Sequence, residues 1–135
     1  MAMQSSPSSG NPPVNRRAQG RLAEDRVAAW LVEQGYRIVA QSYYARPGEI
    51  DIIATKGLIY AFVEVKSRTR EYVDQGQAIT PAKQRALVRA ARTFATLHQL
   101  NYTAVLRFDV AFVGAPPLYN ITYIQNAFSA PDSPY

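Results

Sequence analysis

Asp51, Glu64 and Lys66 all lie in the stretch from Gly48 to Arg68. Asp51 lies in the first of two apolar runs, and Glu64 and Lys66 lie two positions apart in the second. Mg²⁺ in proteins typically takes one or two carboxylates together with water and substrate phosphate. A Glu-x-Lys pair alone is more often part of a solvated strand face, but here a second acid accompanies it. These residues therefore predict a divalent-cation site for phosphate chemistry.

A β-hairpin is the element that would bring these residues together. The runs Glu49–Ala54 and Ile59–Lys66 alternate as strands do, and Lys56-Gly57 is a turn signal between them. Alternate side chains of a strand lie on the same face of a sheet. The face expected to carry the charges holds Glu49, Asp51, Ile53, Tyr60, Phe62, Glu64 and Lys66. The face expected in the core holds Ile50, Ile52, Ile59, Ala61, Val63 and Val65.

The register of this hairpin decides how close the two acids come. If residues 55–58 form a four-residue loop, Asp51 lies diagonal to Glu64, with roughly 7–8 Å between their Cα atoms. If each strand is longer by one residue, the two acids lie directly opposite one another. Like charges in that position destabilise a sheet, so a cation that binds both is the expected reason for keeping them.

Further elements are expected on both sides of the hairpin. Helical periodicity predicts a first helix over Arg17–Gln34, ended by Gly35. A second helix is expected from Thr80-Pro81 to about Leu100. The expected buried stripes hold Gly20, Ala23, Val27, Trp30 and Leu31 in the first helix and Leu87, Ala90, Ala91, Phe94 and Leu97 in the second. Further strands are expected over Tyr36–Tyr44, Val105–Val113 and Tyr119–Gln125.

Four charged residues in these elements need an interpretation. Glu24 lies at the edge of the first stripe and should be partly buried, which is costly unless the acid is partnered. On position alone, a capping or salt-bridging role for Glu24 is as good as a functional one. Lys83 lies in the first turn of the second helix and leans toward the core side. Arg107 and Asp109 share a strand face and are interpreted as a structural ion pair.

Composition narrows the class of protein. A chain of 135 residues is expected to form one domain with one core. The absence of cysteine excludes disulfides and cysteine-ligated zinc, and the single histidine, His98, argues against a histidine-based triad. No run approaches the ~20 apolar residues of a membrane span, and no signal peptide is recognisable, so a cytoplasmic location is expected. The net charge of +5 and the pI near 9.7 favour a polyanionic partner.

The ends of the chain and one internal loop differ from the rest. Residues 1–15 are rich in Ser, Pro, Gly and Asn and are expected to be disordered. The domain is expected over 16–128, with a tail over 129–135. Arg16-Arg17 is equally well a phosphate-binding arm or a solvated junction. The polar loop Ser67–Thr80 is interpreted as a basic loop that faces phosphate, with Arg68 and Arg70 as contacts; the alternative is a plain connection.

The signature Asp51, then Glu64-Val65-Lys66, resembles the active-site motif of the PD-(D/E)XK nuclease superfamily. The wider pattern is similar to the YraN-like bacterial family of small predicted endonucleases, over roughly residues 16 to 128. The blocks that carry this resemblance are Glu24, Gly35-Tyr36, Gly48-Glu49-Ile50-Asp51, Phe62-Val63-Glu64-Val65-Lys66-Ser67-Arg68 and Arg107-Phe108-Asp109. Two positions depart from the family pattern: Ala23 stands where a Gly usually precedes the Glu, and Ser42 where an Asn is common.

The resemblance implies a role for each matching residue. Asp51 and Glu64 would hold Mg²⁺ or Mn²⁺, which polarises the phosphate and activates water. Lys66 would orient that water or offset charge on phosphorus. Glu24 would point at the same site, where it would hold either a water molecule bound to the metal ion or a second metal ion. A lysine at the place of Lys83 is a family feature near the site, and we take it as a nucleic-acid contact.

The element order predicts an α/β fold with a mixed sheet flanked by helices, because the second helix would carry the chain to a parallel strand. This order agrees with the restriction endonuclease-like αβββαβ core that the resemblance implies. The expected function is metal-dependent endonuclease hydrolysis of DNA, branched or Holliday-junction-like DNA included. The alternatives are a non-catalytic nucleic-acid-binding module on the same fold and a structural domain with incidental charges. Resolvase-like relatives form dimers, so a homodimer is compatible with this interpretation.

Overall fold

The computed structural model of this chain describes residues 16–46, 48–67 and 79–130. The predicted N-terminal tail, the predicted phosphate contacts Arg68 and Arg70, and residues 131–135 lie outside the described residues. Within the described part, no helix is both long enough and apolar enough to cross a membrane.

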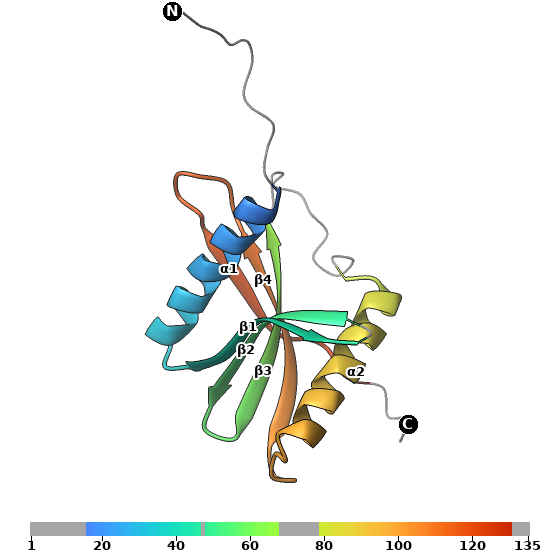
Figure 1. The fold of residues 1–135 in the computed structure, drawn as a ribbon. Coiled ribbons are helices and arrows are strands. Elements are labelled where there is room, and N and C mark those ends of the chain that lie inside the picture. The colour runs from blue at the N-terminus through green and yellow to red at the C-terminus, as the bar shows by residue number, and fades with distance from the viewer. Residues whose placement is uncertain (1–15, 47, 68–78, 131–135) are drawn as a thin grey trace, which may run out of the picture.

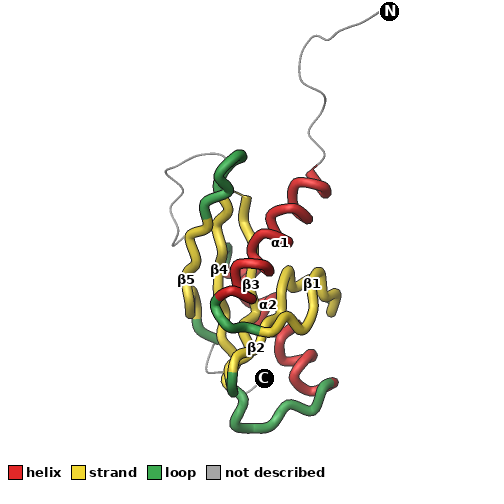
Figure 2. Tube along the Cα trace, turned by 90° about the vertical axis from the view of Figure 1, so that its left-hand side faces the viewer, coloured by secondary structure: helices red, strands yellow, loops and turns green. Residues whose placement is uncertain are grey.

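The described chain forms a five-stranded sheet with one helix on each face (Figure 1). The elements are α1 (Arg16–Glu33), β1 (Arg37–Ala45), β2 (Gly48–Lys56), β3 (Ile59–Ser67), α2 (Pro81–Leu97), β4 (Val105–Val113) and β5 (Ile121–Phe128). The strands lie in chain order from β1 to β5, and only β3 and β4 pair in parallel. Figure 1 shows α1 and α2 on opposite sides of the strands, and Figure 2 views the sheet from the α1 side. The predicted mixed sheet flanked by helices is therefore confirmed.

Local sequence explains where both helices begin or end. The hydroxyl of Thr80 accepts a hydrogen bond from Lys83 N–H (3.1 Å) and so caps the start of α2. Pro81 fits the first helical position because it has no backbone N–H that would be left unpaired there. α2 therefore begins as predicted. Gly35 has φ +97°, a conformation in which a residue with a Cβ is strained, and it ends α1. The ammonium of Lys56 then donates to the carbonyl of Gln34 (2.8 Å) at that helix end.

Each face of the sheet has its own apolar core. On the α1 side, Ala23, Val27 and Leu31 pack on side chains from β2, β3 and β4. On the α2 side, the core is built around Phe94, which makes an edge contact with Phe62 (ring centroids 5.8 Å apart). Two predicted members of the buried stripes are not fully buried. Leu97 is 68% exposed because the helix ends there, and Gly20 is only partly buried, with open space where a Cβ would lie.

The central hairpin turns one residue later than predicted. Lys56 pairs with Ile59, so Gly57 and Leu58 form the turn, and Gly57 supplies the positive φ (+61°). The alternation predicted for β2 also fails at one point. Ile50 packs in the α2-side core, whereas Ile52 packs in the α1-side core. The strand therefore changes its orientation around Asp51.

This change in β2 separates it from β3. β2 stays paired with β1 to its first residue, Gly48, but its pairing with β3 stops at Ile52. The outer part of the β1–β2 hairpin turns toward α2 (Figure 1), where Gly48 approaches Ala86. A gap in the sheet results at Asp51.

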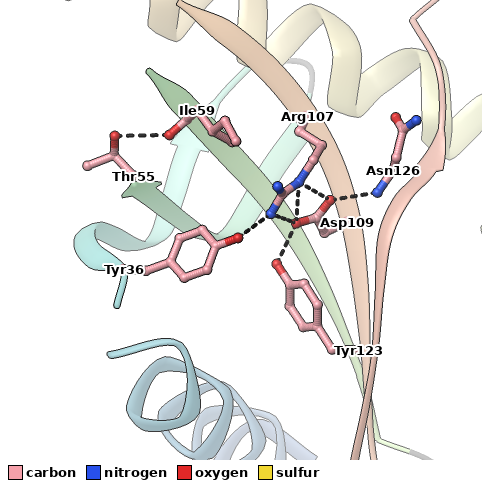
Figure 3. A network of polar contacts seen from close by, with 7 residues as sticks. All are labelled: Tyr36, Thr55, Ile59, Arg107, Asp109, Tyr123 and Asn126. Carbon is pink, nitrogen blue, oxygen red and sulfur yellow. Dashed lines mark hydrogen bonds and ion pairs between the residues drawn. The ribbon is translucent and has the colours of Figure 1, made fainter. Parts of the chain in front are cut away.

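A buried polar network fixes the other half of the sheet (Figure 3). Asp109 of β4 is 1% exposed and pairs with Arg107 (2.8 Å), which confirms the predicted structural ion pair. The guanidinium also donates to the hydroxyl of Tyr36, and the hydroxyl of Tyr123 donates to Asp109 (2.6 Å). Asn126 N–H donates to the same carboxylate (2.9 Å) across an irregularity in the β4–β5 register. Every charge in this network has a partner, so its role is structural.

Candidate active site

Asp51 of β2 and Glu64 of β3 lie side by side where the two strands separate. Ile52 pairs with Val63, so the next position outward brings Asp51 level with Glu64. This is the closer of the two registers considered from the sequence. The Asp51 carboxylate accepts a hydrogen bond from Val65 N–H (2.8 Å to Oδ2), in place of a backbone partner from β2. The gap in the sheet is therefore what positions the two acids.

Two ammonium groups approach Glu64 from different elements. Lys66, on the same strand, places Nζ 3.5 Å from Glu64 Oε2. Lys83, in the first turn of α2, places Nζ 3.8 Å from the same oxygen. The lysine side chains are 40% and 41% exposed, whereas the Glu64 side chain is 6% exposed. Positive charge is thus available between the buried acid and solvent, where an anionic group could bind.

The second oxygen of Glu64 is left without a partner. Glu64 Oε1 is buried and accepts no hydrogen bond from the described residues. Buried polar atoms are nearly always paired, and leaving one unpaired costs about 1–3 kcal/mol. Hard cations such as Mg²⁺ and Mn²⁺ bind carboxylate oxygens of this kind. The orphaned oxygen beside Asp51 therefore fits a divalent cation.

Burial makes the charged form of Glu64 costly. It raises the pKa of Glu64 from its ordinary 4.5 to about 7, and the negative charge of Asp51 acts in the same direction. Lys83 and Lys66 act against this shift without cancelling it. A bound cation favours the ionised form of nearby carboxyls. The pair of acids is therefore electrostatically unfavourable alone and would be relieved by a cation.

Glu24 lies near this pair but is held by a different partner. Its Oε1 accepts a hydrogen bond from the hydroxyl of Ser42 on β1 (3.0 Å). Burial raises the pKa of Glu24, and the charge of Asp51 raises it further, so the two carboxylates sense one another. Ser42 has φ +52°, a region in which Asn is far more common than Ser.

A cleft of about 550 Å³ opens beside these residues. It is lined by Arg17, Gly20, Arg21, Glu24, Ser42 and Glu49. α1 therefore forms one wall, and the β1–β2 hairpin forms the other. The cleft gives a ligand access to Glu24 from solvent.

The structure brings together four of the residues predicted from sequence. Asp51, Glu64, Lys66 and Lys83 converge on one point, with Lys83 against Glu64 rather than out on the surface. Glu24 stays at the margin, and the described residues contain no group of three or more acids or histidines placed to hold an ion.

Sequence reasoning missed two features of this site. The bond from Ser42 to Glu24 was not predicted, although the Asn that the resemblance leads one to expect at that position is a residue that tolerates positive φ. The stripe of Arg17, Gly20 and Arg21 beside Glu24 was also missed, although its helical spacing was readable in the sequence.

Comparison with known proteins identifies one family. A model described as "Uncharacterised protein family UPF0102" matches residues 23–113. A UPF0102 protein of Lachnoclostridium phytofermentans is 38% identical over 87% of this chain and 98% of its own length. Relatives of the same name in Chromohalobacter salexigens and Symbiobacterium thermophilum are 39% and 42% identical, over 89% and 84% of this chain and 98% of their own lengths. None of these names states an activity.

Proposed function

The chain belongs to the UPF0102 family, and from its carboxylate site we propose that it is a metal-dependent endonuclease of the PD-(D/E)XK superfamily that hydrolyses phosphodiester bonds in DNA. The observation that carries this proposal is the pair formed by Asp51 and Glu64 at a break in the sheet. Oε1 of Glu64 is buried without a hydrogen-bond partner among the described residues, and the ammonium of Lys66 lies 3.5 Å from Oε2 of the same side chain.

Asp51 and Glu64 are the residues that would hold Mg²⁺ or Mn²⁺. Two neighbouring carboxylates match the way Mg²⁺ is usually bound at phosphate-processing sites, where water and substrate phosphate complete its coordination. A cation in this position would supply Lewis-acid activation of the phosphodiester and of water. It would also act against burial and the negative charge of Asp51, which together raise the pKa of Glu64.

The two lysines have complementary tasks in this proposal. Lys66 lies on the same strand as Glu64 and can hold a phosphate oxygen or orient a water beside the scissile bond. Lys83 enters from α2 and adds positive charge on the other side of Glu64. Both can offset negative charge that accumulates on the phosphate during hydrolysis.

Glu24 acts from the margin of the site. Its bond from Ser42 fixes the carboxylate toward the cleft rather than into the core. In that position it can accept hydrogen bonds from water beside the scissile phosphate. The proposal therefore assigns Asp51 and Glu64 to the cation, Lys66 to the reacting phosphate and Glu24 to solvent near it.

A cleavage panel tests the proposal. The full chain is incubated with labelled duplex, single-stranded, flap and four-way-junction DNA, in Mg²⁺, in Mn²⁺ and in EDTA. Matched variants are Glu64→Gln, which removes a cation ligand, and Lys66→Met, which keeps both acids. We expect metal-dependent cuts with the parent, none with Glu64→Gln, and loss of cleavage with intact metal binding in Lys66→Met.

The panel also separates the proposed activity from its alternative. Tight DNA binding without cuts under any metal condition would point to the non-catalytic binding module instead. Cleavage by Glu64→Gln at the parent's rate would show that a contaminating nuclease, or another site, does the chemistry.

A further inference from the structure

Four residues of α1 form one continuous stripe along the cleft. They occupy positions i, i+3, i+4 and i+7, which lie on one face of a helix: Arg17, Gly20, Arg21 and Glu24. All four line the cleft that also holds Ser42. The stripe thus runs from two positive charges directly to the acid at the margin of the candidate active site.

The two arginines on this stripe are free to bind something else. Both side chains are exposed, and neither has an ion-pair or hydrogen-bond partner among the described residues. They lie one helical turn apart, on the same side of α1. Two exposed guanidinium groups at this spacing are suited to neighbouring phosphates, which arginine binds in a bidentate manner.

Gly20 lies between the arginines and has no structural reason to be glycine. It sits in the interior of α1, where glycine is less favourable than alanine. A Cβ added at Gly20 would meet no other atom within 4 Å, so the fold itself does not require the bare backbone. The remaining physical use of a glycine there is a close approach of a ligand to the helix backbone.

We propose that Arg17, Gly20 and Arg21 form the binding surface for the sugar–phosphate backbone of a DNA strand that leads into the active site. Gly20 is the point of closest approach, and the arginines hold the phosphates on either side of it. The inference deepens the nuclease proposal and rests on it for the identity of the partner. Glu24 and Glu49 line the same cleft, so the phosphates of the DNA strand are attracted mainly at the arginine end of the cleft.

The charge test uses two matched double variants. Arg17→Gln with Arg21→Gln removes two charges from the stripe, and Arg85→Gln with Arg89→Gln removes two charges, also four residues apart, from the exposed side of α2. The affinity of the full chain for a fluorescent DNA duplex with a single-stranded arm is measured in EDTA over a range of salt. In the stripe variant, the slope of log affinity against log salt should become shallower by about 1.4–1.8, and in the control it should stay near that of the parent.

The glycine test separates binding from folding. Gly20→Ala should raise the melting temperature by about 2–5 °C, because alanine is the better helix former and meets no clash. The same variant should bind DNA several-fold more weakly, and Gly20→Leu more weakly still. Ala29→Leu is the control, because Ala29 is exposed on the opposite side of α1.

The outcomes distinguish this inference from the nuclease proposal. If the parent binds and cuts DNA while Gly20→Leu and the stripe variant bind like the parent, the inference is wrong and the nuclease proposal stands. Equal losses in the two double variants would also overturn it, because charge alone would then explain binding. If the parent binds DNA through the stripe but never cuts it, the nuclease proposal fails alone. If the parent binds no DNA, both fail.

Discussion

Replacing Glu64 by glutamine should make the protein more stable at alkaline pH and change little in acid. The exchange keeps the shape of the side chain but removes the carboxyl that titrates in the gap between β2 and β3. In the parent, burial raises the pKa of this carboxyl to about 7, against an ordinary value of 4.5 in an unfolded chain. Between these two values the folded parent binds more protons than the unfolded chain, so its stability falls as pH rises.

The size of this effect follows from the two pKa values. At about 1.4 kcal/mol for each pH unit between 4.5 and 7, ionising Glu64 costs the fold about 3 kcal/mol. The favourable contribution is complete below pH 4.5 and is lost by about pH 8. The free energy of unfolding of parent and Glu64→Gln should therefore diverge by about 3 kcal/mol between pH 4.5 and pH 8.

Urea unfolding measures the divergence directly. Both proteins are unfolded in EDTA at several pH values from 4 to 8.5, and the difference in unfolding free energy is plotted against pH. Glu33→Gln is a matched control because Glu33 is exposed at the end of α1, so its difference from the parent should stay nearly constant. A flat difference for Glu64→Gln, or one that favours the parent as pH rises, would refute the electrostatic reasoning.

Three further perturbations follow from individual contacts. Asp51→Ala should lower the free energy of unfolding by about 1–3 kcal/mol, because Val65 N–H loses its acceptor. Asp51→Asn should lower it less, and thermal melts of the two variants in EDTA measure the difference. Asp109→Ala should destabilise the fold by about 3–5 kcal/mol, because it leaves Arg107 with an uncompensated charge; a urea midpoint near that of the parent would contradict this. Ser42→Asn should raise the free energy of unfolding by up to about 1 kcal/mol, because Asn tolerates the positive φ better than Ser. Ser42→Ala, at the same φ, should not raise it. Equal melting temperatures for the parent and Ser42→Asn would show that this φ carries no strain.

Most of the fold is predictable from periodicity in the sequence. The strand Val105–Val113 is an uninterrupted apolar run apart from Arg107 and Asp109, and its predicted limits match those of β4. α2 begins where Thr80 and Pro81 predict it, because both act through local backbone chemistry. The predictions succeed where a signal depends only on neighbours in the chain.

Predictions fail where tertiary contacts decide the geometry. Alternation in β2 predicts Ile50 and Ile52 on one face, but the strand leaves β3 at Asp51 and packs Ile50 toward α2. The end of β5 extends past the predicted Gln125 because Asn126 N–H binds Asp109, seventeen residues earlier in the chain.

In the candidate site, too, the residue types were predictable from the sequence, whereas the contacts that depend on tertiary structure were not. Asp51, Glu64 and Lys66 were recognisable from residue type and spacing on two neighbouring strands. The approach of Lys83 to Glu64 depends on how α2 crosses the sheet, and the bond from Ser42 to Glu24 depends on a left-handed backbone in β1. Neither arrangement has a local signal strong enough to fix its geometry.

The most direct test of the central claim is the single-turnover rate of DNA cleavage as a function of Mn²⁺ concentration, for the parent and for Glu64→Gln purified in parallel. The substrate is the DNA of the panel that the parent cuts fastest. The account predicts a rate for the parent that rises and saturates with Mn²⁺ and is abolished by EDTA, and no measurable rate for Glu64→Gln at any Mn²⁺ concentration. Identical saturation curves for the two proteins would contradict the assignment of Asp51 and Glu64 as the site of cation-dependent hydrolysis.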